Sequence, residues 1–234
     1  MTAMTERGAT GAEEVGRGPL SRGTAAFYRY LVLTALIALT TLPGSVLAFL
    51  LHRDASNAPL FALALVPLAP ALSAALYAQR EWERDDDQRP ARPFWRGYRR
   101  NLGDVLRWWV PALALGTVLA INLAGAGLVA GAAFYVPVSL LLLVVLALLC
   151  AQMLVITATL SFRTVDAARI ALHGLVRYWR FDVAVLCLLL VVGALVVLAW
   201  DPAPILASGV LLAMLRPFAR PVVADVTERF TTRD

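Results

Sequence analysis

Few residues of this chain have a type and spacing that could carry out chemistry. The chain has two Cys and two His, and all 21 of its positively charged side chains are Arg. Without Lys, it can have neither a phosphate-loop lysine nor a lysine that forms a Schiff base. Cys150 and Cys187 fall within long apolar segments without metal-ligand spacing, and His52 and His173 fall on opposite sides of the membrane predicted below. We therefore predict no catalytic residue, no metal site and no cofactor.

An acidic run, Asp85-Asp86-Asp87, is a further candidate for metal chemistry. Acidic clusters of this kind bind metal ions in enzymes that act on prenyl phosphates, but no second cluster accompanies this one. A solvated loop is the better interpretation. The chain also has no GxSxG and no HExxH motif, so it lacks the usual nucleophile and zinc signatures. A membrane enzyme is therefore the least favoured class of function.

The apolar residues are arranged in long blocks. Hydrophobic residues make up 60% of the 234 residues and charged ones 16%, with a mean hydropathy of +0.72. The blocks reach the roughly 20 residues that cross a bilayer. We predict an all-α polytopic membrane protein whose six transmembrane helices form three hairpins. The predicted spans are 30–51, 59–78, 108–128, 132–160, 183–200 and 202–218, within a domain over 30–220 that lies between a flexible N-terminal tail (1–29) and a C-terminal tail (221–234).

The distribution of Arg predicts the orientation. With six spans and a cytoplasmic N-terminus, the cytoplasmic segments hold 20 Arg residues and the outside loops hold one, Arg53. The last run, 202–218, is short for a span. If it did not cross the membrane, the Arg residues at the C-terminus would lie outside, and the counts would change to 16 cytoplasmic against 5 outside. Because cytoplasmic loops are enriched in Arg, we predict six spans with both termini in the cytoplasm of a bacterial inner membrane.

Two segments between the spans have an apolar face and a basic face. In 94–109, apolar residues recur every three or four positions with Arg on the other side, and 165–180 repeats the pattern. Such helices lie on the inner leaflet, where each Arg gains about 1 kcal/mol from anionic headgroups. We predict two amphipathic cytoplasmic helices that contact anionic lipid or a partner protein, and no nucleic acid. The candidate contact residues are Phe94, Arg96, Arg99, Arg100, Asn101, Arg107, Arg169, Arg177 and Arg180.

Polar residues inside the spans are the remaining candidates. Asn122 and Gln152 are predicted either to hydrogen-bond between helices or to line a substrate path. Every Asp, Glu and Arg lies at or beyond the end of a predicted span, which disfavours proton-coupled transport. Asp182 is expected to cap a helix, and Asp104 to pair with Arg100 four residues before it.

Prolines occur within the first two predicted spans. Pro43 lies in the first span, and Pro67 and Pro70 lie in the second. Proline removes a backbone hydrogen bond, so kinked helices are expected at these positions. Broken helices can line transport paths, but kinked packing is the commoner outcome.

The first half of the chain resembles the YesL-like bacterial membrane proteins, a family of unknown function. The resemblance covers roughly residues 30–110 and rests on Leu42-Pro43, on the segment 67–78 (PLAPALSAALYA) and on 93–106 (PFWRGYRRNLGDVL). The family often has an Asn early in the first span and a Thr after the proline of that span. In this chain the first span contains no Asn, and Gly44 follows Pro43. The resemblance implies no catalytic residues and a link to sugar ABC transporters.

Two functions remain open on these grounds. The leading hypothesis is an accessory component of a carbohydrate ABC uptake system, since the chain lacks the cytoplasmic loop of an ABC permease. The alternative is a small self-contained transporter or channel with Asn122, Gln152 and the proline-kinked first hairpin along its path. A homo-oligomer stays open in either case.

Overall fold

The computed structural model describes residues 19–84, 89–128, 132–160, 164–198 and 203–231. These residues contain helices and no strand, which confirms the all-α prediction. The helices are α2 (Pro19–Leu50), η1 (Ala55–Asn57), α3 (Ala58–Ala64), α4 (Leu68–Arg84), α5 (Ala91–Ala124), η2 (Ala126–Leu128), α6 (Ala132–Thr159), α7 (Thr164–Arg177), α8 (Trp179–Leu198) and α9 (Ala203–Thr231).

Six helical segments are long and apolar enough to cross a membrane, as predicted. They are Gly23–Leu50, Ala55–Glu83, Ala91–Ala124, Ala132–Thr159, Trp179–Leu198 and Ala203–Glu228. Large apolar side chains such as Phe49, Phe134 and Leu190 are more than 70% exposed. In water such a surface would be unstable, whereas lipid solvates it. The chain is therefore a multi-pass membrane protein.

The helices at both ends extend beyond the predicted spans. α2 begins at Pro19, and α9 continues as far as Thr231 in spite of Pro217 and Pro221. Residues 19–29 and 221–231, predicted as parts of the two tails, are thus helical. The second half of α9 is held in place because Val222 and Val226 are almost completely buried.

The second predicted span is broken into two helices. α3 ends at Ala64 and α4 begins at Leu68, with Pro67 in the turn between them. The indole Nε1 of Trp109 donates a hydrogen bond to the carbonyl oxygen of Leu65 over 3.0 Å, so α5 provides a partner for the broken backbone. On the other side, α2 approaches closely at Gly44, where an added Cβ would overlap the carbonyl oxygen of Ala64.

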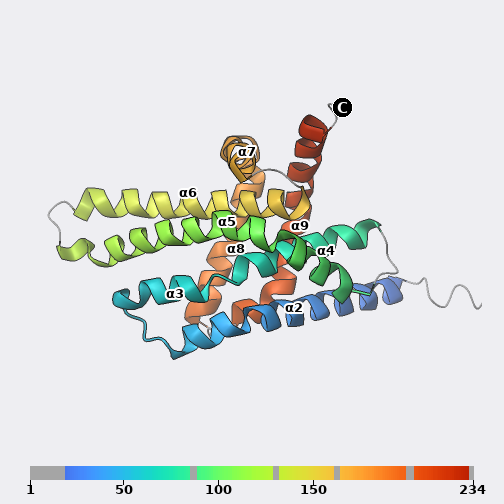
Figure 1. Cartoon of the computed structure of the whole chain (residues 1–234), viewed down its shortest axis with the longest axis horizontal. Helices are drawn as coiled ribbons and strands as arrows, with labels where there is room; N and C mark the ends of the chain where they lie inside the picture. The colour runs from blue at the N-terminus through green and yellow to red at the C-terminus, as the bar shows by residue number, and fades with distance from the viewer. Residues whose placement is uncertain (1–18, 85–88, 129–131, 161–163, 199–202, 232–234) are drawn as a thin grey trace, which may run out of the picture.

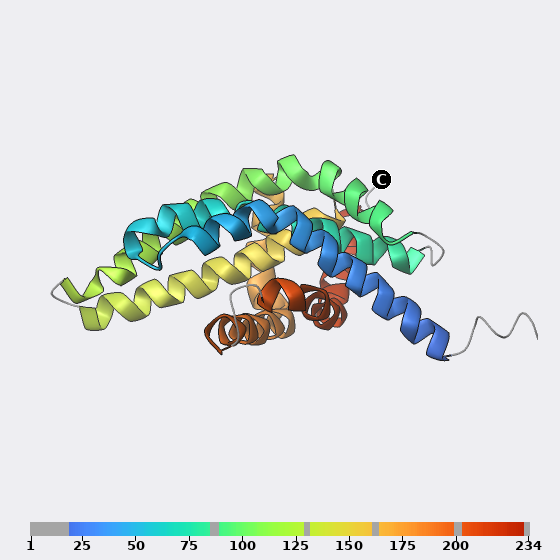
Figure 2. The ribbon, with the colours of Figure 1, turned by 90° about the horizontal axis from the view of Figure 1, so that it is seen from below.

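The helices run in several directions, and α7 is seen end-on in Figure 1. α2, α4, α5 and α6 lie lengthwise in Figure 1, whereas α8 and α9 run steeply across them and are seen nearly end-on in Figure 2. α5 packs beside α6, α8 packs beside α9, and α9 also contacts α2. The last two helices therefore cross the layer formed by the first four.

The core is centred on α4. Its Ala71, Ala74 and Ala78 have no exposed surface, and small side chains allow neighbouring helices to approach closely. α5 packs extensively against this helix, with Gly97 so near that a Cβ there would lie 2.8 Å from the ring of Tyr77. The charged end of α4 lies next to α9, where Glu83 contacts Arg216.

Candidate functional site

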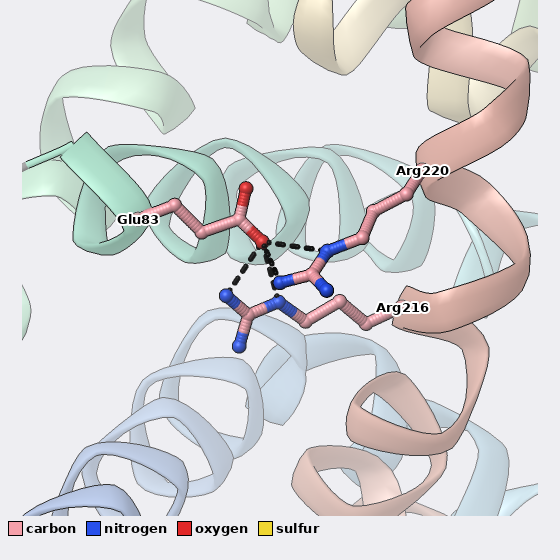
Figure 3. A network of polar contacts seen from close by, with 3 residues as sticks. All are labelled: Glu83, Arg216 and Arg220. Atoms are coloured by element: carbon pink, nitrogen blue, oxygen red, sulfur yellow. Dashed lines mark hydrogen bonds and ion pairs between the residues drawn. The ribbon is translucent and has the colours of Figure 1, made fainter.

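A carboxylate near the end of α4 binds two guanidinium groups from α9. The Nε and Nη2 of Arg216 lie 2.8 and 2.6 Å from Oε1 of Glu83, and those of Arg220 lie 3.1 and 2.8 Å from the same oxygen. Figure 3 shows both Arg side chains reaching from one helix to Glu83. Residues four apart lie on the same face of a helix, so Arg216 and Arg220 can both reach Glu83. We call this group of three side chains the Glu83 clamp.

A cleft of about 450 Å³ adjoins the Glu83 clamp between α4, α6 and α9. Its residues combine an apolar wall with a polar and charged rim. They are Leu76, Gln79, Arg80, Glu83, Val155, Thr159, Arg216, Ala219, Arg220, Val223, Ala224, Thr227 and Glu228. Arg80 also donates to the carbonyl oxygen of Thr159, which joins α4 to the end of α6. The cleft is thus large enough for a small molecule and is amphipathic.

A second polar cluster joins α7 to α9. Arg177 donates from Nε and Nη2 to the two carboxylate oxygens of Asp225, each over 3.1 Å, and the hydroxyl of Tyr178 donates to Asp225 Oδ2. The hydrogen bond and charge of Asp225 raise the pKa of Arg177. Burial, together with donation to Asp225, raises the pKa of Tyr178 to about 12. Tyr178 is therefore neutral at physiological pH and can donate.

A third polar contact is fully inside the protein. Gln152 of α6 is buried and donates from Nε2 to Oδ1 of Asp182 over 3.0 Å, and Asp182 of α8 is only 6% exposed. Gly174 of α7 leaves room for the amide, since a Cβ there would lie 3.2 Å from Gln152 Oε1. Asp182 lies within the first turn of α8 and bonds to another helix, so the expectation that it caps a helix is wrong.

The predicted contact residues divide into exposed and buried ones. Phe94 has no exposed surface and stacks on Tyr98 with ring centroids 6.2 Å apart, and the buried Asn101 donates to the hydroxyl of Ser73 over 3.2 Å. Both residues are buried in contacts that hold α5 in place. The exposed members of the set are Arg96, Arg99, Arg100, Arg107, Arg169, Arg177 and Arg180.

Some of these exposed Arg residues have acidic partners. Arg96 lies 3.6 Å from Glu81, and Arg107 lies 2.9 Å from Asp104. The expected pairing of Asp104 with Arg100 is therefore wrong, because the carboxylate turns toward the Arg residue that follows it by three positions. Arg99 and Arg100 have no ion pair among the described residues.

The two polar candidates for a substrate path do not meet. Gln152 is bonded to Asp182, whereas Asn122 is exposed near the end of α5. α5 and α6 follow each other as packed neighbours, and Gln152 lies about 20 residues beyond the start of α6 at Ala132, which is roughly 30 Å along a helix. The structure thus places the two side chains in different parts of the molecule.

Other candidates for chemistry remain isolated. Cys150 is half-buried, and Cys187, His52 and His173 are exposed. Within the described ranges, no three His, Cys, Asp or Glu side chains lie close enough to hold a metal ion. The acidic run Asp85-Asp86-Asp87 lies outside the described residues.

Sequence reasoning missed the residues that form the cleft. The prediction placed Glu83 in the charged loop after the second span, and it gave Gln79 no role. The signal that could have identified them is the pair Arg216 and Arg220, spaced by four residues on the last apolar run. Arg residues within a membrane helix often pair with an acidic residue, and the charged end of the second span is a source of one.

The fold and the polar clusters thus define an α-helical multi-pass membrane protein with an Arg-lined cleft. Residues 29–123 match the model of a family described as "Protein of unknown function, DUF624". Neither the curated proteins nor the solved structures contain a match to the chain. The matched range runs from α2 almost to the end of α5, so it includes α4 and the carboxylate of Glu83 but not α6 to α9.

Proposed function

We propose that this protein is a non-catalytic accessory component of a bacterial inner membrane that assists a carbohydrate ABC uptake system by contacting one of its subunits. The link to carbohydrate uptake comes from the resemblance of residues 30–110 to the YesL-like proteins. Contact with a partner is supported by the exposed basic face on the first half of α5.

The observation that carries the proposal is this basic face. Arg96, Arg99 and Arg100 are exposed, while Phe94 and Asn101 of the same turns are buried against α4. The helix is therefore held firmly with its charged side outward. Because Arg99 and Arg100 have no acidic partner among the described residues, both are available to a carboxylate of another protein.

The alternative function, a self-contained transporter, has less support from the geometry. Its path would need Asn122 and Gln152 to line one channel. Asn122 is exposed, and Gln152 is bonded to Asp182. These positions do not favour a path that both side chains line.

The test is sugar uptake in cells that carry Arg99→Ala/Arg100→Ala in place of the wild-type protein. Asn101 stays unchanged because it bonds to Ser73 in the core. The charge-matched control is Arg89→Ala/Arg92→Ala, which removes two exposed Arg residues from the start of α5 and the residues just before it. We expect uptake to fall in the first variant and to stay normal in the control. Normal uptake in both variants, at equal protein levels, would contradict the proposal.

The rival is tested separately with purified protein in liposomes. An accessory component produces no sugar flux on its own. Flux through liposomes that contain only this chain would show a self-contained transporter instead.

A further inference from the structure

The rim of the cleft carries more positive than negative charge. Three Arg side chains, Arg80, Arg216 and Arg220, face two carboxylates, Glu83 and Glu228. Arg216 and Arg220 both use Nε and Nη2 on a single oxygen, Glu83 Oε1. The Nη1 amino groups of both take no part in this contact (Figure 3). Arg216 is also hydrogen-bonded to Tyr30, and the Glu83 clamp, with two guanidinium groups on one carboxylate, carries a net positive charge.

A buried donor inside the cleft also lacks an acceptor. Gln79 lines the cleft, is only 3% exposed, and its Nε2 has no hydrogen-bond partner among the described residues. An unpaired buried amide costs about 1–3 kcal/mol. This donor lacks an acceptor in the described part of the chain, and an oxygen-rich anion could supply one to it while also accepting from the two guanidinium groups.

Part of the cleft lining is an apolar wall. It is formed by Leu76 of α4, Val155 of α6, and Ala219 and Val223 of α9. The volume of about 450 Å³ far exceeds the space that an inorganic phosphate ion fills. A free anion would leave this wall bare, whereas a hydrocarbon chain would cover it.

We infer that the cleft between α4, α6 and α9 binds an anionic phospholipid, whose phosphate accepts hydrogen bonds from Arg216, Arg220 and Gln79 and whose acyl chain lies along the apolar wall. The site goes beyond the proposed accessory role, because it involves neither Arg99 nor Arg100 and requires no partner protein.

The test measures lipid binding to the purified full-length protein. Native mass spectrometry and the melting temperature are followed while phosphatidylglycerol, phosphatidylcholine or inorganic phosphate is added. We expect phosphatidylglycerol to stay bound and to raise the melting temperature, and the other two to do neither. Equal effects of both lipids would overturn the inference. An equal effect of inorganic phosphate would assign the site to a free anion and overturn the lipid assignment.

Two variants locate the effect in the cleft. Arg216→Gln/Arg220→Gln removes the guanidinium groups, and Gln79→Leu removes the buried donor while it keeps the side-chain volume. We expect each to weaken binding of phosphatidylglycerol by about tenfold or more, which corresponds to lost hydrogen bonds to a charged group. Gln79→Leu leaves the Glu83 clamp intact, so it decides the question even if the double variant does not fold.

The control is Arg99→Gln/Arg100→Gln, which removes the same charge from α5 outside the cleft. If general attraction to anionic lipid explained the binding, this variant would weaken it as much as Arg216→Gln/Arg220→Gln does. That result, or unchanged affinity in Gln79→Leu, would contradict the assigned site.

Discussion

At the scale of single residues, the buried pair Gln152 and Asp182 has more acceptor atoms than donor atoms. Gln152 Nε2 bonds to Asp182 Oδ1, but Gln152 Oε1 and Asp182 Oδ2 are both buried acceptors without a donor in the part of the chain that the structure describes. A buried polar atom without a partner is costly. A neutral group at the position of the Asp182 carboxylate would therefore lower the cost of burial.

This balance makes substitutions at the two positions behave differently. Asp182→Asn removes the buried charge but keeps a carbonyl oxygen that can accept from Gln152 Nε2, so we expect a melting temperature at least as high as that of the wild type. Gln152→Leu leaves Asp182 without its donor and should lower the free energy of unfolding by about 1–3 kcal/mol. Thermal unfolding in detergent measures both, and an equal loss in the two variants would contradict the hydrogen-bond pattern.

Tyr178 gives a prediction in the alkaline range. Its pKa is raised to about 12, above the value near 10 of a free tyrosine. Because the folded value is the higher one, its contribution to stability is complete below pH ~10 and is lost as the pH rises through about 12. Tyrosinate absorbance during an alkaline titration should show one late group that Tyr178→Phe lacks.

Asp225 is the control for this titration. Asp225→Asn removes the charged acceptor but leaves Tyr178 buried, so we expect the titration to move part of the way toward pH ~10. A late group that persists unchanged in Tyr178→Phe would show that a different tyrosine is responsible.

Sequence reasoning could predict the residue types at these positions but not their partners. Gln152 was expected to hydrogen-bond within the membrane, yet Asp182 lies 30 residues away on α8. Glu83 and Arg216 are separated even further along the chain. Such pairs depend on the register between helices, which no local pattern of residues encodes.

At the scale of helices, the break between α3 and α4 depends on three neighbours. Pro67 interrupts the backbone, Trp109 donates to Leu65, and Gly44 allows α2 to lie against the carbonyl of Ala64. The sequence predicted a kink here from its prolines. It could not predict the close approach of Gly44, because that depends on how α2 packs across the break.

A methyl group at this approach should destabilise the protein. Gly44→Ala brings its Cβ onto a backbone oxygen that cannot turn aside, so we expect a loss of roughly 1–3 kcal/mol in the free energy of unfolding. Gly103→Ala is the matched control, since a Cβ at Gly103 meets no atom within 4 Å and alanine favours a helix. The prediction fails if both variants unfold at the same temperature.

At the scale of the whole molecule, six apolar helices were predictable and their arrangement was not. The lengths of the apolar blocks predict the number of long helices, because the bilayer sets that length. The steep crossing of α8 and α9 over the other helices (Figure 1) depends on contacts such as α9 with α2. These contacts join the two ends of the chain, and hydropathy contains no information about them.

The Arg distribution makes a testable prediction of orientation. In a variant without Cys150 and Cys187, a cysteine placed by Ser56→Cys should react with a membrane-impermeant maleimide in intact cells. A cysteine placed by Arg99→Cys should react only after the membrane is opened, because the Arg distribution predicts that the Arg-rich segments lie in the cytoplasm. Both positions are exposed, and the reverse pattern of labelling would contradict the predicted orientation.

The central claim, that this chain acts by contacting a partner, is tested most directly by gentle purification of the tagged protein from its native membrane. Mass spectrometry then measures the amounts of the proteins that accompany it. The accessory role predicts sugar-permease subunits in near-stoichiometric yield, and their loss in Arg99→Ala/Arg100→Ala. Recovery of the chain alone, or only with further copies of itself, would contradict the claim and favour a self-contained transporter.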